Sequence, residues 1–388
     1  MAGQPLAQSD YRRGHGRVQK HVRHSSEVRD VSDGHPGSEH GCSVRRGVRA
    51  VPAPAKTLGL WTPSSPAPAL FPRRTARALR AVKRSGWGVS ATPSYAGLSR
   101  AGAAEPRELA AELHALVSEG GVDAVLATAG GWTSSLVLPH LDFALLRDAG
   151  VPLIGYSDVS VLLWAFAVAG VPAVHGPMLI SEFGHFTGAF PYTVAGLRSA
   201  LAGAGGQLRP PTSWSDDNPW WDRDDERPLR MNPATAWRVV RHGCARGPLL
   251  AGCLPAVTGL FGTPYMPETD GHVIFLEDFG MGPDRFLALL SQWRLSGRLE
   301  KFAGLVLGRR GRPGTAPGGY DDFDDALLHT LGDIDIPVVA DVDFGHTEPR
   351  LSLRQKAIVS LATDPLLMRV EASRPSNTHI EGNTRARQ

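Results

Sequence analysis

Three residues of the types that form a catalytic triad lie far apart in the sequence, each near the end of a predicted strand. Ser157 lies in "LIGYSDVSV", Glu277 in "HVIFLEDFG" and His346 in "ADVDFGHTEP". A serine hydroxyl attacks a carbonyl carbon efficiently when a histidine removes its proton and a carboxylate orients that histidine. Together the three residues predict acyl transfer through a serine nucleophile, although a single histidine in such a place is more often an ordinary loop residue.

The residues around Ser157 can be explained in two ways. Ser157 lies between an apolar strand and an apolar helix, two residues after Gly155, which is the setting of a nucleophile elbow. The helix dipole and the amide of Asp158 could then stabilise negative charge on a carbonyl oxygen. However, Val159 stands where the G-x-S-x-G pattern of hydrolases has its second glycine. The alternative is that Ser157 or Asp158 only caps the helix, and this segment alone leaves both explanations open.

Two other strand ends also have polar groups that allow a functional and an ordinary explanation. In "ATAGGWTSS", Gly130 and Gly131 allow a tight turn with outward-facing amides, as an oxyanion or phosphate site requires, but such a pair is often only a turn. The carboxylates of Glu277 and Asp278 could simply cap the next helix. The functional explanation is favoured because a serine, a carboxylate and a histidine all occur at strand ends of one chain.

The scaffold for these residues can be predicted from the alternation of apolar runs. Segments typical of strands and of helices follow one another from residue 57 to residue 170, and chemistry in such α/β sheets takes place at the carboxyl ends of the strands. The expected strands are 57–61, 88–94, 122–131 and 151–158, and the expected helices are 69–86, 105–120, 134–150 and 159–170. This order predicts a parallel sheet with helices on both faces.

The fold class expected for the whole chain is therefore α/β, with two domains. We expect an N-terminal parallel-sheet domain of the flavodoxin or Rossmann type and a smaller C-terminal α/β domain, with the active site in the cleft between them. The predicted parts are a disordered basic tail at 1–55, the N-terminal domain with the nucleophile at 56–200, a Trp-rich loop or linker at 201–246, the C-terminal domain with the glutamate and the histidine at 247–375, and a disordered tail at 376–388.

The charge distribution argues against a nucleic acid polymer as partner. The first 50 residues hold nine Lys/Arg and five Asp/Glu, so the other 338 residues carry 32 basic against 33 acidic side chains. A neutral body offers no basic face to a phosphate backbone. The tail, with its five histidines, could be a basic arm or a metal-binding tract, but its composition favours a solvated extension.

Apolar runs and cysteines predict a cytoplasmic protein without a membrane partner. No window of 18 uncharged apolar residues is present, and the N-terminus lacks the apolar core of a signal peptide. The three cysteines, Cys42, Cys244 and Cys253, are too few and too irregularly spaced for a disulfide framework, which fits a reducing compartment.

Several segments resemble the LD-carboxypeptidase family of serine peptidases. These are "GYSD", "GTPYMPETDGHVIFLED" and "FGHTEPRLSL", together with "PSSP" at 63–66 and "GGWTSSLVLPHLD". The resemblance extends from about Leu58 to about Val370. It implies a serine carboxypeptidase that needs no cofactor and forms a homodimer.

The resemblance also assigns roles to individual residues. It implies a triad of Ser157, Glu277 and His346, with the backbone amides of Gly131 and Asp158 as the oxyanion hole. The 69 residues from Glu277 to His346 are close to the family's usual spacing, whereas the 120 residues from Ser157 to Glu277 exceed that of the short members.

The additional length lies in a segment rich in tryptophan, "SWSDDNPWWDRDDERPLRMNPATAWRVVRHG". It resembles the extended loop of the microcin C self-immunity peptidases, family members that cleave peptidyl nucleotide antibiotics. Indole faces stack on nucleobases, so the segment is interpreted as a flexible lid over the substrate. The alternative is that these tryptophans pack the lid against the second domain or a dimer partner. The predicted substrate-binding residues are Gly130, Trp132, Ser134, Trp214, Trp220 and Trp221.

Some positions depart from the family pattern. Ala251 and Cys253 stand where the family has Gly and Asn in G-G-N, and Leu136 lies near an arginine of the murein-type members. Thr133 and Ser135 replace two amides of the microcin-type pattern. Cys253 is predicted to be a small buried hydrophobic residue. No metal is predicted, because the histidines and cysteines show no spacing typical of a metal site.

The predicted function is that of a serine carboxypeptidase or amidohydrolase with a Ser-Glu-His triad, of the microcin C self-immunity type. Its partner would be a small peptide or an aminoacyl-nucleotide, whose amide bond it cleaves. One alternative is a murein-recycling LD-carboxypeptidase that removes a terminal D-residue from a tetrapeptide. The other is a binding protein that kept the fold and lost its catalysis.

Overall fold

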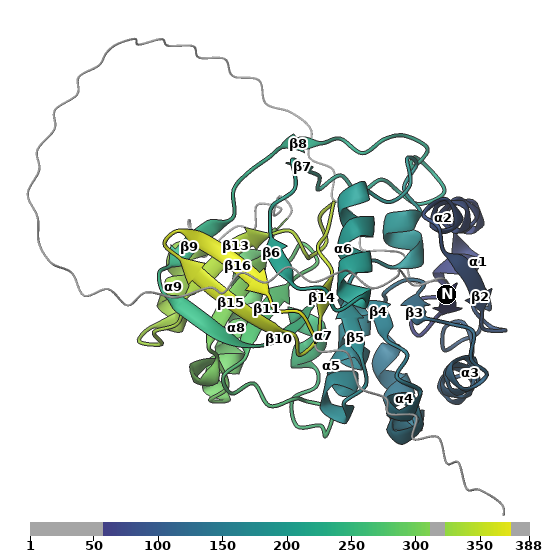
Figure 1. The fold of residues 1–388 in the computed structure, drawn as a ribbon, viewed down its shortest axis with the longest axis horizontal. Coiled ribbons are helices and arrows are strands. Elements are labelled where there is room, and N and C mark those ends of the chain that lie inside the picture. Colours follow the sequence, from purple (N-terminus) through teal and green to yellow (C-terminus); the bar gives the residue numbers. More distant parts are fainter. Residues whose placement is uncertain (1–56, 311–322, 374–388) are drawn as a thin grey trace, which may run out of the picture. The chain divides into compact units, whose positions relative to one another are not determined.

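Two β-sheets form the framework of the protein in residues 57–310 and 323–373, which the computed structural model describes (Figure 1). The first sheet has six strands in the order β14-β5-β4-β3-β1-β2, and the second has eight in the order β6-β16-β15-β10-β11-β12-β13-β9. A short pair, β7 (Ser213–Trp214) and β8 (Asn232–Pro233), lies outside both sheets. The predicted mixed α/β class with a parallel N-terminal sheet is thus confirmed.

The first sheet contains the strands that the sequence pattern indicated. Strands β1 to β5 are parallel, and only β14 joins in the antiparallel direction, beside β5. The strands are β1 Thr57–Trp61, β2 Gly88–Ala91, β3 Ala124–Ala127, β4 Leu153–Gly155, β5 Ala173–His175 and β14 Leu353–Arg354. The helices are α1 Ala67–Leu70, α2 Pro72–Arg84, α3 Pro106–Ser118, η1 Ser134–His140, α4 Phe143–Ala149, η2 Ser157–Val159, α5 Ser160–Ala169, η3 Leu179–Phe183 and α6 Pro191–Leu201.

The helix expected at 134–150 is in fact two separate elements. The first, η1, is a 3-10 helix that contains Pro139, and a proline inside a helix removes one hydrogen bond and clashes with the preceding turn. The second, α4, begins afresh at Asp142, whose carboxylate accepts hydrogen bonds from the amides of Ala144 and Leu145. The proline and the new cap explain why one apolar pattern became two helices.

The second sheet is mixed. Strands β10 to β13 are parallel, whereas β9 at one edge and β15, β16 and β6 toward the other edge run antiparallel to their neighbours. The strands are β6 Gly206–Leu208, β9 Arg238–Arg241, β10 Cys244–Cys253, β11 Val273–Glu277, β12 Gly304–Gly308, β13 Val338–Val342, β15 Ile358–Thr363 and β16 Leu366–Val370. The helices are α7 Leu254–Thr258, α8 Pro283–Leu295, η4 Leu299–Lys301 and α9 Phe323–Leu331.

Helix α5 joins the cores of the two sheets. Eight of its ten residues are buried, and it packs against β4 and β5 on one side and against β10 and α7 on the other. A helix that is apolar all round is stable only when protein surrounds it. One continuous apolar cluster therefore runs from α3 and α5 to the helices of the second sheet. The turn that carries Ser157 is built directly onto this buried helix.

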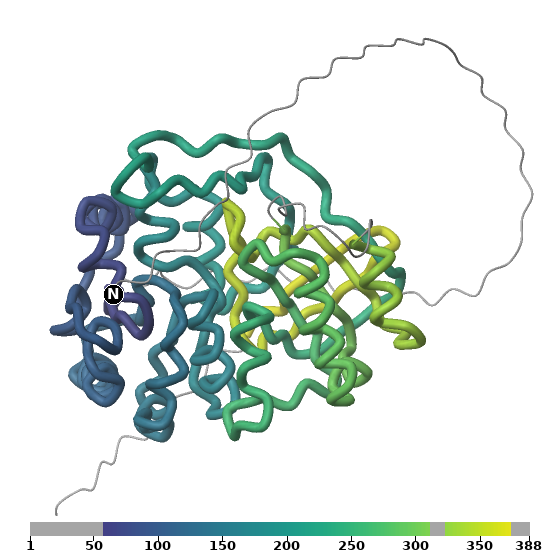
Figure 2. Tube along the Cα trace, turned by 180° about the vertical axis from the view of Figure 1, so that it is seen from behind, coloured from purple at the N-terminus to yellow at the C-terminus, as the bar shows by residue number. Residues whose placement is uncertain are grey.

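The segment predicted as a linker at 201–246 takes part in the second sheet, because β6 and β9 are its two edge strands. Between them the chain forms a strap, residues 209–237. In Figure 2 its teal to green tube runs from the helices of the first sheet to the strands of the second. The predicted tails at 1–55 and 376–388 lie outside the described residues. None of the described helices is long and apolar enough to cross a membrane.

Candidate active site

Ser157 has a backbone conformation that is rare for a residue with a side chain. It follows β4, and its φ of 58° places it in the left-handed region. Gly130, after β3, lies so close that a Cβ atom there would be 2.9 Å from both Cβ and Oγ of Ser157. Only glycine leaves room for the serine at this distance. Such strain at a strand-to-helix turn is characteristic of a nucleophile elbow.

The capping explanation for this segment fails in the structure. The N-cap residues of η2 and α5 are Tyr156 and Val159, and neither helix has a side-chain cap bond. Instead, the Asp158 carboxylate accepts a hydrogen bond from the hydroxyl of Ser64 at 2.6 Å and another from the amide of Ser134 at 2.9 Å. Asp158 thus fastens the "PSSP" segment and the glycine loop to the nucleophile turn. Sequence reasoning quoted the "PSSP" motif but did not assign Ser64 a role.

Glu277 and His346 form a close pair. His346 Nδ1 lies 2.6 Å from Glu277 Oε2. Glu277 is the last residue of β11, and His346 lies four residues beyond the end of β13, two strands away in the parallel part of the same sheet. A Cβ atom on Gly345 would be 2.9 Å from Glu277 Cβ, so only glycine at this position lets the loop run so close to the glutamate side chain. The carboxylate is placed to fix one tautomer of the histidine ring and to stabilise its charged form.

The electrostatic surroundings keep Glu277 ionised. Burial alone would raise the pKa of this carboxyl, whose side chain is 1% exposed, but the adjacent His346 lowers the pKa below its usual value. The second carboxylate oxygen, Oε1, is buried without a hydrogen-bond partner among the described residues. Glu277 therefore offers negative charge both to His346 and to any further cation that reaches Oε1.

Tyr156 links Ser157, its neighbour in the chain, to the Glu277–His346 pair. The ring of Tyr156 lies edge-on to His346 with centroids 4.9 Å apart, and Tyr156 immediately precedes the left-handed serine. The hydrogen bonds of the described residues do not include one between Ser157 and His346. Catalytic hydrogen bonds often shorten only when substrate is bound. The first sheet thus supplies the serine, and the second supplies the glutamate and the histidine.

A buried charge cluster that sequence reasoning missed lies behind Tyr156. The guanidinium carbon of Arg350 is 3.7 Å from the centre of the Tyr156 ring, and its Nη2 is 2.8 Å from Glu182 and 3.0 Å from Glu348. Burial raises the pKa of Glu182. For Glu348, burial opposes the Arg350 charge, which nevertheless lowers the pKa. The sequence contains one local signal, because Glu182 is a charged residue within the apolar run "PMLISEF", but this signal does not identify Arg350 as its partner.

His175, the last residue of β5, is a second missed residue. It is completely buried, neither ring nitrogen has a hydrogen-bond partner among the described residues, and Nε2 is 4.0 Å from Glu277 Oε1. Burial lowers its pKa to about 4, so the ring is neutral at pH 7. A neutral imidazole against Glu277 completes the wall of the site without competing with His346 for the carboxylate charge.

The predicted substrate-binding residues of the glycine loop lie beside the nucleophile. A Cβ atom on Gly131 would be 2.4 Å from Ser64 Oγ, so this backbone passes directly over the Ser64–Asp158 contact. Ser134 is buried, and its amide rather than its hydroxyl makes the bond to Asp158. Trp132, in contrast, is 80% exposed. An exposed aromatic residue that sequence reasoning missed, Phe279, lies on the other side, with its ring 4.8 Å from His346.

The three tryptophans of the strap lie in different surroundings. Trp221 packs edge-on against Phe71 of the first domain at 5.2 Å, and not against the second domain or a dimer partner, which the packing alternative named. Trp214 is half-buried, with the guanidinium carbon of Arg309 4.8 Å from its ring centre. Trp220 is 42% exposed. These surroundings leave Trp220 the most accessible of the three indoles.

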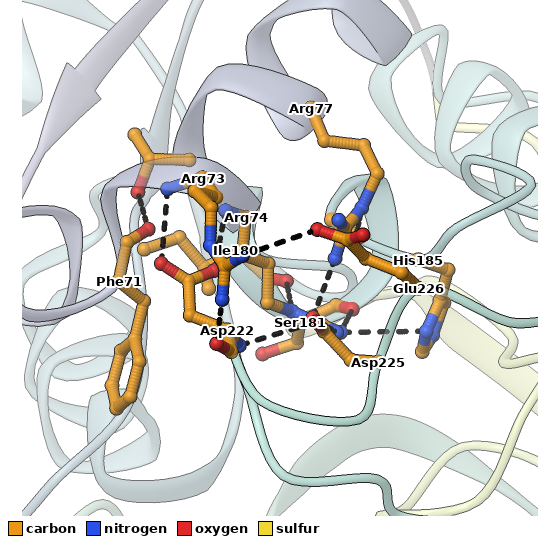
Figure 3. A network of polar contacts seen from close by, with 12 residues as sticks. Phe71, Arg73, Arg74, Arg77, Ile180, Ser181, His185, Asp222, Asp225 and Glu226 are labelled. Carbon is orange, nitrogen blue, oxygen red and sulfur yellow. Dashed lines mark hydrogen bonds and ion pairs between the residues drawn. The ribbon is translucent and has the colours of Figure 1, made fainter.

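The strap is anchored to the first sheet by buried ion pairs, as Figure 3 shows. Asp225, 1% exposed, accepts hydrogen bonds from Arg74 and Arg77 of α2. Arg74 also donates to the carbonyl oxygens of Ile180 and Ser181, and Asp222 accepts from the amide of Arg74 at 2.7 Å. A strap held in this way has a defined position next to η3.

Two of the positions that depart from the family pattern, Ala251 and Cys253, are buried, whereas Leu136 is 51% exposed. Ala251 is a core residue of β10, and its carbonyl oxygen accepts hydrogen bonds from the Trp164 indole and the Gln355 amide. Cys253 is 3% exposed, as predicted for a small buried residue. It is nevertheless not in apolar surroundings, because its sulfur, a ligand atom of Glu277 and a ring nitrogen of His346 all lie within 4.8 Å of one another.

Comparisons with known proteins agree with the fold and the motifs. Residues 58–176 match the family model of the LD-carboxypeptidase N-terminal domain, and residues 246–361 match that of the C-terminal domain. The chain therefore belongs to the LD-carboxypeptidase family of serine peptidases and is a serine-type carboxypeptidase.

Individual relatives cover most of the chain. A carboxypeptidase-named protein of Vibrio cholerae is 30% identical over 302 residues, which are 76% of this chain and 88% of the relative. The microcin C7 self-immunity protein MccF of Escherichia coli is 26% identical over 76% of this chain and 88% of its own length. A structure of MccF in complex with glutamyl sulfamoyl guanosine superposes with a TM-score of 0.76 at 24% identity, covering 84% of this chain and 98% of that one. This structural similarity shows that the chain and MccF have the same fold.

Proposed function

We propose that this peptidase hydrolyses an amide bond through a triad of Ser157, His346 and Glu277. His346 takes the proton of the serine hydroxyl, the serine oxygen attacks the carbonyl carbon, and Glu277 stabilises the imidazolium that forms. His346 then gives the proton to the leaving amine. Water, activated by His346, releases the acyl group from Ser157 in the second half of the reaction.

The observation that carries the proposal is the 2.6 Å contact between His346 and Glu277 next to a serine held at a φ of 58°. The amides of Gly131 and Asp158 are the proposed oxyanion hole. The first turn of a helix leaves its N–H groups without intrahelical partners, and Asp158 lies in the first turn of η2. A binding protein that had lost its catalysis would not require this strained serine.

For the substrate, we propose an aminoacyl or peptidyl nucleotide. The relative MccF is named for self-immunity to microcin C7, and one of its structures holds glutamyl sulfamoyl guanosine. In this chain, Trp132, Phe279 and Trp220 are exposed aromatic side chains of the kind that stack on a base. The strap that carries Trp220 is joined to the loop of His346 by a backbone bridge between Ser215 and Glu348.

The test compares two substrates with the wild type and with Ser157→Ala. The substrates are an aminoacyl sulfamoyl adenosine and a murein tetrapeptide that ends in D-Ala, and product release is followed by mass spectrometry. We expect cleavage of the nucleotide substrate and a loss of at least about 1000-fold in kcat for Ser157→Ala. The hydroxyl is the only group removed, so the near-ultraviolet circular dichroism of the variant should match that of the wild type.

Each other outcome contradicts a defined part of the proposal. Cleavage of the tetrapeptide alone would replace the nucleotide substrate by a muropeptide and leave the triad in place. Activity that survives Ser157→Ala would refute the triad. Binding of either substrate without turnover would identify a non-catalytic binding protein.

A further inference from the structure

Cys253, Glu277 and His346 form a group of three metal-ligating side chains within the candidate active site. One ligand atom from each lies within 4.8 Å of the other two. Cys253 and Glu277 are register partners at the ends of the neighbouring parallel strands β10 and β11, so their side chains emerge on the same face of the sheet. His346 reaches the same point from the loop after β13.

We propose that these three residues bind a borderline divalent cation of the Zn²⁺ type, and that this binding switches off the peptidase. The metal-binding half of this inference stands on the geometry alone. The regulatory half rests on the proposed function, because it assumes that His346 and Glu277 act on Ser157.

The oxygen Oε1 of Glu277 points independently to a missing cation. It is buried and has no hydrogen-bond partner among the described residues, in a side chain that is 1% exposed. The ring nitrogen Nε2 of His175 is 4.0 Å from Oε1, which is beyond hydrogen-bond distance. A divalent cation at this point would satisfy the free carboxylate oxygen directly.

The thiol of Cys253 suits the same cation. Its side chain is 3% exposed and lies beside Glu277, its register partner on β11. When a cation binds, Cys253 loses its proton to solvent and a sulfur–metal bond forms. In tetrahedral zinc sites sulfur and nitrogen ligands are about 3.5 Å apart, so the longest separation here must shorten by about 1 Å.

The ligand types decide which cations bind. One thiolate, one imidazole and one carboxylate suit Zn²⁺ and Co²⁺, whereas Mg²⁺ and Ca²⁺ require oxygen ligands. The family pattern has asparagine where this chain has Cys253, and an amide does not ionise to bind Zn²⁺.

Metal binding blocks catalysis whichever ring nitrogen of His346 is used. At Nε2 the metal occupies the lone pair that would accept the serine proton. At Nδ1 it replaces the proton shared with Glu277 at 2.6 Å. In both cases the histidine ceases to be a general base.

The experiment follows Co²⁺ binding to the full-length protein by absorption spectroscopy. A cobalt–thiolate bond gives a charge-transfer band in the near ultraviolet, which histidines of the N-terminal segment cannot produce. We expect the band in the wild type and in the double variant Cys42→Ser/Cys244→Ser, its absence in Cys253→Ser, and its disappearance when Zn²⁺ is added. Cys253→Asn, the residue of the family pattern, is a second variant in case Cys253→Ser does not fold.

Zn²⁺ inhibition is measured in parallel, relative to the activity of each variant without metal. We expect inhibition of the wild type that a chelator reverses, no effect of Mg²⁺, and a weakening of at least about 100-fold in the Cys253 variants. A band that persists in Cys253→Ser would overturn the metal site. Equal inhibition with and without Cys253 would overturn the regulatory role. Should no substrate be cleaved at all, the proposed function fails with the regulatory half, and the cobalt spectrum still decides the metal site.

Discussion

Ser215 and Glu348 donate their amide hydrogens to each other's carbonyl oxygens, at 2.7 and 2.9 Å. Ser215 follows Trp214 in the strap, and Glu348 lies two residues after His346. The strap is thus attached at one point to the loop of the candidate base and at another, through Asp225, to helix α2. The strap is therefore fixed to elements of both sheets.

The Asp225 attachment should contribute strongly to stability. Asp225→Ala leaves Arg74 buried without its partner, and breaking a buried pair in this way costs about 3 to 5 kcal/mol. We expect the free energy of unfolding in urea to fall by about 3 kcal/mol. Glu226→Ala is the matched control, because its pair with Arg73 is more than half exposed on both sides, and such a pair contributes less than about 1 kcal/mol. Equal effects of the two variants would contradict the anchoring role.

The close approach of Gly130 to Ser157 gives a second prediction. In Gly130→Ala the new methyl group would lie 2.9 Å from the serine side chain, and it must push Ser157 aside. We expect a loss of about 1 to 3 kcal/mol in stability and of about 100-fold in kcat, because a shift of about 1 Å at a nucleophile has an effect of that size. In the control Gly206→Ala the methyl group meets no atom within 4 Å, so kcat should not change. Full activity of Gly130→Ala would show that the serine does not need this position.

The parts of the site that the sequence predicted are those with a local signature. Ser157, Glu277 and His346 could be found because each follows an apolar strand, and the carboxyl ends of the parallel strands of a sheet lie at the same edge. The left-handed backbone of Ser157 and its close approach to Gly130 could not be inferred, since they appear only when the neighbouring strands β3 and β4 are paired. Pro139, which divides the helix expected at 134–150, was visible in the sequence, but the apolar pattern on either side of it concealed the break.

The partners of buried charges could not be predicted either. Arg350 reads as a surface residue from its type, and only the assembled structure brings it against Tyr156 and two glutamates. Similarly, Cys253 was correctly expected to be buried. Its place beside Glu277 follows from the pairing of β10 with β11, which the periodicity of a single strand does not specify.

Replacing Glu277 by glutamine should separate its role in catalysis from a role in binding. The amide oxygen can still accept a hydrogen bond from His346 but cannot stabilise an imidazolium, so we expect kcat to fall by about 1,000- to 10,000-fold with KM nearly unchanged. Asp270→Asn, at an exposed ion pair with Lys301, is the control that removes a carboxylate elsewhere. A change in KM alone would indicate that Glu277 contacts substrate and does not assist His346.

The buried His175 should make stability depend on pH in the acid range. Its pKa is about 4 in the folded protein, because of burial, against 6.5 as the usual value, so the unfolded chain takes up the proton first. The stabilisation is therefore complete above about pH 6.5 and is lost as the pH falls toward 4. The shift corresponds to about 3 kcal/mol. We expect the free energy of unfolding, measured in urea from about pH 7 to about pH 4, to fall less steeply in His175→Gln and His175→Phe than in the wild type.

Both variants are needed for the His175 test, because each removes the titration but they pack differently against Phe344, whose ring centre is 5.6 Å away. The two variants will differ in their free energy of unfolding at pH 7, but the change of this free energy with pH should be the same in both. A slope that equals that of the wild type in both would mean that His175 takes up its proton in the folded state as readily as in the unfolded one. In that case the ring would carry a charge beside Glu277 only below about pH 6.5, and at such pH values His175 rather than a metal ion would satisfy the free carboxylate oxygen.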